Sequence, residues 1–260
     1  MTRSIRNTLL PHEPFSTALA VTVATIITAV TANAQDYHNS VTLYGLVPWV
    51  DTEVTGSGGN SAESSVTPGD IIDSLEFGFM AAGESRFGKF SFLYDAVYSD
   101  LEENGTLGGP FAGAAQVDVK MLIASAALGY VFYEESGRLL QGYGGIRVVD
   151  VRTDVGLVGG GPVGAAFDAR IDETWVDPMI GLRGRVDIND KLSLGGFASI
   201  GGFGVGSELS FDIFGGVEYA FSERFSANAG FRYMSFDYDA GTADLDLEMY
   251  GPVFGFTMRF

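Results

Sequence analysis

Apolar and polar side chains alternate with a period of two along most of the chain beyond residue 35. In residues 225–233 every odd position is apolar or aromatic, and the even positions are small or polar. Residues 209–221 and 90–99 repeat the pattern. A period of two is typical of a β-strand whose two faces meet different surroundings. The pattern therefore predicts an all-β protein in which one face of each strand suits an apolar environment.

Ten segments follow the alternation and are predicted to be strands. They are residues 40–50, 71–87, 89–101, 116–133, 138–152, 173–188, 191–203, 207–221, 224–238 and 244–260. Four short connections carry the Gly, Asn, Asp or Ser that tight turns favour, at residues 87–89, 134–137, 189–190 and 222–223. Three other connections are long, at residues 51–70, 102–115 and 153–172.

Short turns that alternate with long loops, together with an even strand number, are the layout of a bacterial outer-membrane barrel. We therefore predict one transmembrane up-and-down antiparallel β-barrel of about ten strands, with eight as the alternative. The sequence beyond residue 34 has no run of about 18 apolar residues, which a membrane-spanning helix would need. A soluble β-sandwich also alternates, but it needs more polar outward faces than these strands carry.

Aromatic residues gather near the predicted strand ends, as they do at the two interfaces of a membrane barrel. The predicted girdle at the short-turn ends consists of Phe87, Phe90, Phe92, Tyr130, Phe132, Tyr219, Phe221 and Phe225. Trp49 and Trp175 lie near the long connections and are expected to contribute to the opposite girdle. Any single ring could instead pack in a core.

The first 34 residues have the features of a secretory signal peptide. Arg3 and Arg6 give a basic start, and residues 15–30 are apolar but interrupted by threonines. Ala32 and Ala34 have the spacing that a signal peptidase accepts, so we place cleavage after Ala34. The barrel domain is then residues 35–260. A retained N-terminal anchor is the alternative.

The composition narrows the classes of function. The chain has no cysteine, which excludes disulfides and thiolate metal sites. Glycine, at 36 residues, occurs together with 13% aromatic residues, a pairing that suits bent and closely packed strands rather than a flexible chain. The formal charge of -18 argues against a nucleic-acid partner.

The last residues alternate up to a terminal aromatic side chain. Phe254, Phe256, Met258 and Phe260 resemble the C-terminal signature by which outer-membrane barrels are recognised for assembly. That resemblance implies dependence on the barrel-assembly machinery and a periplasmic C-terminus. An even strand number then places both termini of the mature chain in the periplasm.

Residues 43–51, 70–80 and 94–101 resemble a family of small porin-like bacterial outer-membrane β-barrel proteins whose activity is not characterised. The resemblance covers the first three predicted strands well and the rest only by pattern. It implies the barrel fold and an outer-membrane location, with lipid and lipopolysaccharide as surroundings. It supplies no catalytic residues, and we expect a monomer.

The inventory of histidines argues against an enzyme. Barrel enzymes of this size use histidine with a carboxylate or serine for acid–base chemistry. The chain has two histidines: His12 leaves with the signal peptide, and His38 precedes the first strand on the periplasmic side. We therefore predict no catalytic residues, no cofactor and no metal site, although a carboxylate-only mechanism stays open.

The connections opposite the short turns are acidic. Their carboxylates include Asp150, Asp154, Asp168, Asp172, Glu173, Asp237, Asp239, Asp244, Asp246 and Glu248. We interpret them as solvated loops, and a role in bridging lipopolysaccharide through divalent cations is a second hypothesis. Asp244, Asp246 and Glu248 share parity with the terminal aromatic residues. They are tolerable only outside the bilayer or beyond a β-bulge.

The opposite parity predicts which charged residues face the barrel interior. They are Glu76, Glu84, Arg86, Asp95, Lys120, Arg147, Asp177, Arg183, Arg185, Asp212, Glu218, Arg232 and Arg259. The list includes both positive and negative residues. A ten-stranded barrel is only slightly wider than an eight-stranded barrel, whose interior is just filled by side chains. The first interpretation is a salt-bridged polar core in a structural barrel, and the second is a narrow pore for small solutes. A third possibility is that the long loops bind lipopolysaccharide or a host surface.

Overall fold

The structure is a computed structural model that describes residues 37–56, 61–107, 113–159, 166–239 and 243–260. These residues form one compact unit, Tyr37–Phe260. The predicted signal peptide, with Ala32 and Ala34, lies outside them. Within the described ranges, no helix has the length and apolar character needed to cross a membrane.

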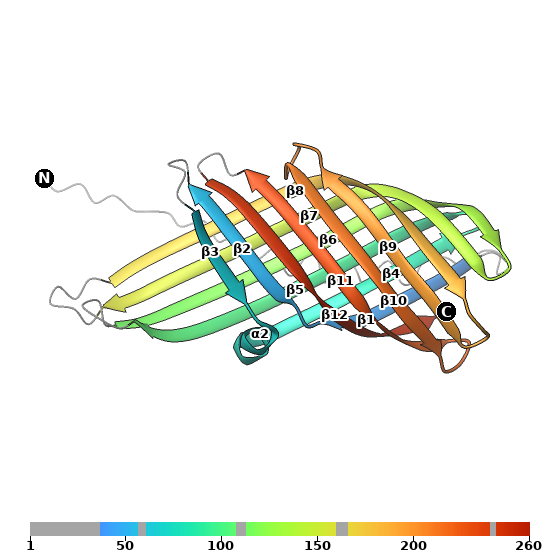
Figure 1. Ribbon diagram of the computed structural model, residues 1–260, viewed down its shortest axis with the longest axis horizontal. Helices are drawn as coiled ribbons and strands as arrows, with labels where there is room; N and C mark the ends of the chain where they lie inside the picture. Colours follow the sequence, from blue (N-terminus) through green and yellow to red (C-terminus); the bar gives the residue numbers. More distant parts are fainter. Residues whose placement is uncertain (1–36, 57–60, 108–112, 160–165, 240–242) are drawn as a thin grey trace, which may run out of the picture. The chain divides into compact units, whose positions relative to one another are not determined.

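Ten strands close into an antiparallel ring, which confirms the predicted fold class and strand number (Figure 1). In ring order they are β1 (Tyr37–Leu46), β4 (Leu75–Phe87), β5 (Phe90–Leu107), β6 (Gly113–Glu135), β7 (Arg138–Gly159), β8 (Ala166–Asp187), β9 (Leu192–Gly202), β10 (Leu209–Ala220), β11 (Phe225–Asp239) and β12 (Ala243–Arg259). The ring closes because β1 pairs with β4 on one edge and with β12 on the other.

One end of the barrel, which we call the turn end, holds both ends of the described chain and the four predicted short turns. Asn39 and Phe260 exchange backbone hydrogen bonds of 3.2 and 3.0 Å there, which ties the first strand to the last. The β6–β7 turn needs positive φ at both central residues, and Ser136 and Gly137 adopt φ of 53° and 71°. The turn chemistry was therefore readable from the sequence.

At the opposite end the prediction of long loops is wrong, because most of residues 102–115 and 153–172 continue β5 to β8 as strands. Residues 51–70 contain most of β2 (Trp49–Gly56), all of β3 (Ser61–Val66) and the start of α2 (Pro68–Ser74). The predicted strand 71–87 is also wrong at its start. Thr67 and Asp70 form a capping box, and Pro68 occupies the first turn, so residues 68–74 are helical.

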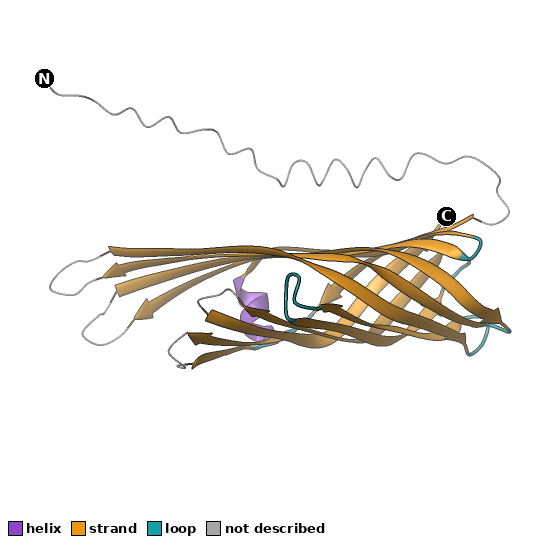
Figure 2. Cartoon of the chain, turned by 90° about the horizontal axis from the view of Figure 1, so that it is seen from above, coloured by secondary structure: helices purple, strands orange, loops and turns teal. Residues whose placement is uncertain are grey.

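The wall of the barrel divides beyond β1 and β9. β2 continues to pair with β12 but not with β4, and β8 pairs with β9 only from Met179 to Asp187. There the single twelve-stranded sheet divides into two parts that do not pair with each other, β4–β8 on one side and β10–β12 with β2 and β3 on the other, with α2 beside them (Figure 2); we refer to these parts as the two sheets. We call the part with the complete ring the band, and the two-sheet part the extension.

The inside and outside of the strands exchange character between these two parts. In the band the outward side chains are apolar, for example Phe90, Leu128, Phe231 and Phe256, at 66%, 72%, 50% and 67% exposure. In the extension the inward side chains are apolar. They form a buried core between the two sheets from Leu46, Val97, Ile123, Val149, Trp175, Met234, Phe236, Leu247, Met249 and Val253.

β12 passes through both parts without a bulge, because its pairing with β11 runs unbroken from Met258 to Asp244. Asp244, Asp246 and Glu248 are therefore on the outward face of the extension, as one of the two sequence alternatives required. Acidic and aromatic residues share one parity on this strand because they lie in different parts of the molecule.

The aromatic girdles are partly as predicted. The turn-end rings are exposed except Phe92, which is half-buried. Trp49 is exposed and stacks on Tyr250, with ring centroids 6.0 Å apart. Trp175 is wrongly placed by the sequence, since it is buried in the core of the extension and stacks on Tyr238 at 4.3 Å.

Candidate functional site

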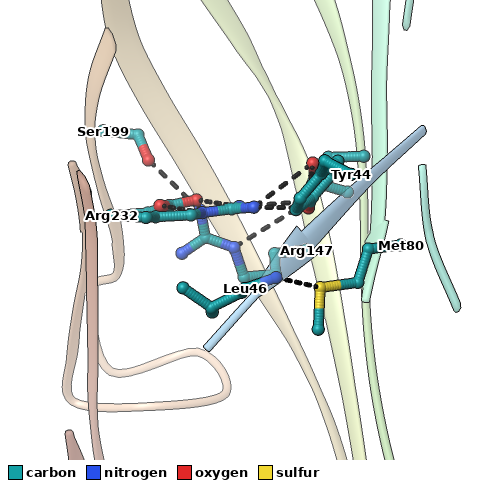
Figure 3. A network of polar contacts seen from close by, with 9 residues as sticks. Tyr44, Leu46, Met80, Arg147, Ser199 and Arg232 are labelled. Atoms are coloured by element: carbon teal, nitrogen blue, oxygen red, sulfur yellow. Dashed lines mark hydrogen bonds and ion pairs between the residues drawn. The ribbon is translucent and has the colours of Figure 1, made fainter. Parts of the chain in front are cut away.

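Four charged residues, three of them buried and one partly buried, cross the interior at the junction between the band and the extension. Asp95 from β5, Arg147 from β7, Asp212 from β10 and Arg232 from β11 form what we call the charged layer (Figure 3). Arg232 Nη2 lies 2.8 Å from Asp95 Oδ1 and 2.9 Å from Asp212 Oδ2. Arg147 Nη2 lies 2.9 Å from the same Asp212 oxygen. Two positive and two negative charges thus compensate one another.

The layer is supported by polar and aromatic neighbours. The Tyr44 hydroxyl donates to Asp95 at 2.8 Å and accepts from Arg232 Nη1 at 2.6 Å. Rings also face the guanidinium groups, with Arg147 Cζ 5.6 Å from the centre of Phe236 and Arg232 Cζ 5.5 Å from that of Phe197. Such compensation is necessary, because an unpaired buried charge costs several kcal/mol.

A cavity of about 1040 Å³ extends from the charged layer to the turn end. It is lined by further ion pairs between strands. Arg183 Nη1 lies 2.9 Å from Glu84 Oε2, and Glu218 Oε1 lies 3.3 Å from Arg185 Nη1. Glu218 also pairs with Arg259. At the mouth Arg86 pairs with Glu134.

Most of the charged residues predicted to face inward come together in the layer and the cavity. These are Glu84, Arg86, Asp95, Arg147, Arg183, Arg185, Asp212, Glu218, Arg232 and Arg259. Asp177 is also buried, but no arginine among the described side chains pairs with it; it accepts hydrogen bonds from the backbone NH and hydroxyl of Ser207 at 2.7 and 2.6 Å. The side chain of Glu76 lies outside the described residues.

Lys120 is the one predicted inward residue that the described side chains place on the outside. It is half exposed and pairs with Asp100 at 2.8 Å, which raises the pKa of its amine through that hydrogen bond. The sequence argument failed because it assumed a polar interior along the whole strand. In the extension the inward positions of β6 belong to apolar residues such as Met121 and Ile123.

Sequence reasoning also missed residues that complete the site. Tyr44 was not included among the polar interior residues. Strand alternation does not show which group its hydroxyl will bond. Glu134 was assigned to a turn, although it pairs with Arg86. Ser207 was predicted to begin a strand, but it lies in the turn between β9 and β10, and only the folded position of that turn brings it to Asp177.

The outer face of the extension carries a row of carboxylates across four strands. Asp237, Asp246, Glu53 and Glu63 are consecutive partners in β11, β12, β2 and β3. Desolvation raises the pKa of Asp246, and the neighbouring Asp237 and Glu53 raise it further. Within the described ranges, no group of three or more His, Cys, Asp or Glu side chains is arranged to hold a metal ion.

The structure describes only one of the two histidines. His38 lines the mouth of the cavity at the turn end. His12 lies outside the described residues.

A closed ten-stranded antiparallel barrel with an outward apolar band and a polar interior beneath it is the fold of bacterial outer-membrane proteins. Among solved structures, the chain is similar to the outer membrane protease OmpT from Escherichia coli, with a TM-score of 0.54 and 10% sequence identity over 89% of this chain and 99% of that one.

Two other similar structures have lower scores. The translocator domain of the autotransporter NalP from Neisseria meningitidis gives a TM-score of 0.42 at 10% identity, covering 94% of this chain and 96% of that one. Neisserial surface protein A gives 0.34 at 14% identity, covering 88% and 100%. The sequence matches no family model and no curated protein. The comparison with OmpT therefore supports the fold.

Proposed function

We propose that the chain is an integral protein of the outer membrane that holds a surface-exposed extension on a barrel whose interior is closed. The observation that carries this proposal is the exchange of inside and outside between the band and the extension. Apolar outward faces suit lipid, whereas the acidic outward faces and apolar core of the extension suit water. The proposal favours surface interaction over solute passage.

A closed interior is supported by the charged layer and the core behind it. Arg147, Asp212 and Arg232 are 1%, 3% and 3% exposed, and the core residues of the extension are buried directly beyond them. A solute entering from the turn end would have to displace paired charges and then a packed apolar core. Both steps are costly.

Conductance in planar bilayers tests the closed interior. Residues 35–260, refolded and shown to be inserted by heat-modifiable gel mobility, are expected to carry no discrete current steps. A variant with Arg147→Gly and Arg232→Gly removes the two largest side chains of the layer and serves as the comparison. Current steps from the unmodified protein, of the size expected for a small pore, would restore the passage hypothesis.

The orientation of the barrel in the membrane is tested separately. The chain has no cysteine, so a single introduced cysteine is the only thiol that can be labelled. Glu63→Cys places a thiol on β3 of the extension, and Glu223→Cys places one in the β10–β11 turn. In intact cells a membrane-impermeant maleimide is expected to label only the first, whereas lysed cells label both. This result would put the extension outside the cell and both termini in the periplasm. Labelling of Glu223→Cys alone in intact cells would reverse the orientation.

The remaining parts of the proposal follow from the sequence. The terminal residues Phe254, Phe256, Met258 and Phe260 are outward or terminal and support recognition by the barrel-assembly machinery. A signal peptide ending at Ala34, a monomeric state, contact with lipopolysaccharide and membership of the small porin-like family belong to the same proposal. We infer no histidine-dependent catalysis, although a similar structure is a protease, since His38 lies at the turn end.

A further inference from the structure

One wall of the cavity, formed by β8 to β11, carries two contrasting rows of residues. In the first row Arg183, Phe197, Phe214 and Arg232 are consecutive partners across the four strands. In the next row, nearer the turn end, the partners are Arg185, Gly195, Gly216 and Gly230. Directly opposed residues of antiparallel strands point to the same side. Both rows therefore face the cavity.

The glycine row leaves a shallow hollow beside aromatic rings. Phe197 and Phe214 stack with ring centroids 5.7 Å apart, and both line the cavity. The Phe214 ring lies over two of the glycines, because a Cβ on Gly216 or Gly230 would be only 2.8 or 2.6 Å from its atoms. At Gly195, by contrast, a Cβ would meet nothing nearer than a backbone oxygen at 3.6 Å. The hollow at Gly195 is open space.

Arginines with spare hydrogen-bonding capacity border this hollow. Arg183 and Arg185 are 40% and 42% exposed although they lie inside the barrel. Arg185 shares Glu218 with Arg259 through Nη1, and its Nε donates to Asp187 at 2.9 Å. The whole cavity is also less acidic than the protein, since it holds eight of the 15 basic residues and eight of the 33 acidic ones.

We propose that this hollow binds a small organic anion with a flat aromatic ring. The ring lies over Gly195 against the edges of Phe197 and Phe214, and a carboxylate or phosphate group takes two hydrogen bonds from Arg185. A cavity of this size accommodates such a molecule with water around it. The site is on the turn-end side of the charged layer, so it depends on neither the closed interior nor the surface role proposed above.

Ligand-observed fluorine NMR of 4-fluorobenzoate tests the site, with the full mature chain refolded in zwitterionic detergent. We expect saturable line broadening that unlabelled benzoate reverses. Gly195→Leu fills the hollow, and the space at that position lets the variant fold; binding should be lost. Gly215→Leu is the matched control. Gly215 precedes Gly216 on β10, so it faces outward, and a Cβ there would have nothing within 4 Å. Its binding should equal that of the unmodified protein.

Two further measurements, on an arginine variant and on other ligands, identify which chemical groups the site binds. Arg185→Gln is expected to weaken 4-fluorobenzoate binding by at least about tenfold, and the uncharged 4-fluorobenzyl alcohol should not bind. Displacement by phenyl phosphate that is stronger than by benzoate would assign the site to phosphate-bearing rings. Heat-modifiable gel mobility reports folding of each variant. Equal broadening with Gly195→Leu and Gly215→Leu, or equal binding of the alcohol, would overturn the proposal.

Discussion

The band and the extension use the same alternating strands for opposite purposes. In the band, alternation sends apolar side chains outward and charged ones into the cavity. In the extension, the same strands send Val97, Trp175 and Phe236 inward and carboxylates outward. A strand therefore does not carry one fixed amphipathic face. Its surroundings, lipid or water, decide which parity must be apolar.

The charged layer lies at the junction between the band and the extension. On one side of it the interior is polar and open to the turn end, and on the other it is packed and apolar. Breaking the layer therefore tests whether the two parts are stabilised separately or through this junction.

Replacing Asp212 by alanine should have the largest effect. Among the described ion pairs, Arg147 would then have no carboxylate partner and Arg232 would keep only Asp95. An uncompensated buried charge costs about 3–5 kcal/mol of unfolding free energy. Urea titration followed by heat-modifiable gel mobility measures the loss. Asp187→Ala is the control, since its pair with Arg185 is exposed and should cost less than about 1 kcal/mol. Equal losses of unfolding free energy in the two variants would show that the charged layer contributes no more to stability than an exposed ion pair.

A matched pair of arginine substitutions on β12 tests the comparison directly. Phe254 and Glu248 lie on the same outward face of one unbroken strand. Phe254→Arg should destabilise the barrel by about 2–4 kcal/mol if that side chain faces the middle of the lipid layer. Glu248→Arg should change the unfolding free energy little, because that position faces water. Folding in lipid vesicles, with urea titration, gives both values, and a similar cost at both positions would contradict the assignment of lipid and water.

Much of the band was readable from the sequence. Alternation around Phe225 to Tyr233, the terminal aromatic residues and the turn at Ser136 and Gly137 each report a local requirement of the backbone or of lipid. The interior was predictable to the same extent, because inward parity in the band coincides with charge. Parity alone identified Arg147, Asp212 and Arg232, although it gave no information about which would pair.

The extension was not readable in the same way. Its acidic residues looked like loops because a solvated strand and a solvated loop have similar compositions. Its apolar inward residues, such as Trp175, looked lipid-facing because alternation gives a period but not a direction. Lys120 was placed inward for the same reason. The capping box of Thr67 and Asp70 was a local signal for the helix, and it was available in the sequence.

The β9–β10 turn is joined to β8, across the divided wall, through the buried side chain of Asp177. Asp177→Ala would leave the backbone NH and hydroxyl of Ser207 without their acceptor, which costs about 1–3 kcal/mol. Hydrogen exchange at the Ser207 amide should become faster. Asp177→Asn keeps a carbonyl oxygen for this amide and should retain most of its protection. Unchanged exchange in the alanine variant would show that the turn is held in another way.

The smallest expected effect concerns the carboxylate row of the extension. Because the pKa of Asp246 is raised in the folded protein, the stability that its protonation provides is present at low pH and is lost as pH rises through the raised pKa. Asp246→Asn removes the repulsion from Asp237 and Glu53 and should stabilise the extension at neutral pH by about 0.2–1 kcal/mol. The gain should disappear below the ordinary pKa of an aspartate, where the native carboxyl is already neutral. Limited proteolysis of the extension across this pH range measures it, and a gain that did not change with pH would mean that packing, rather than charge, limits this face.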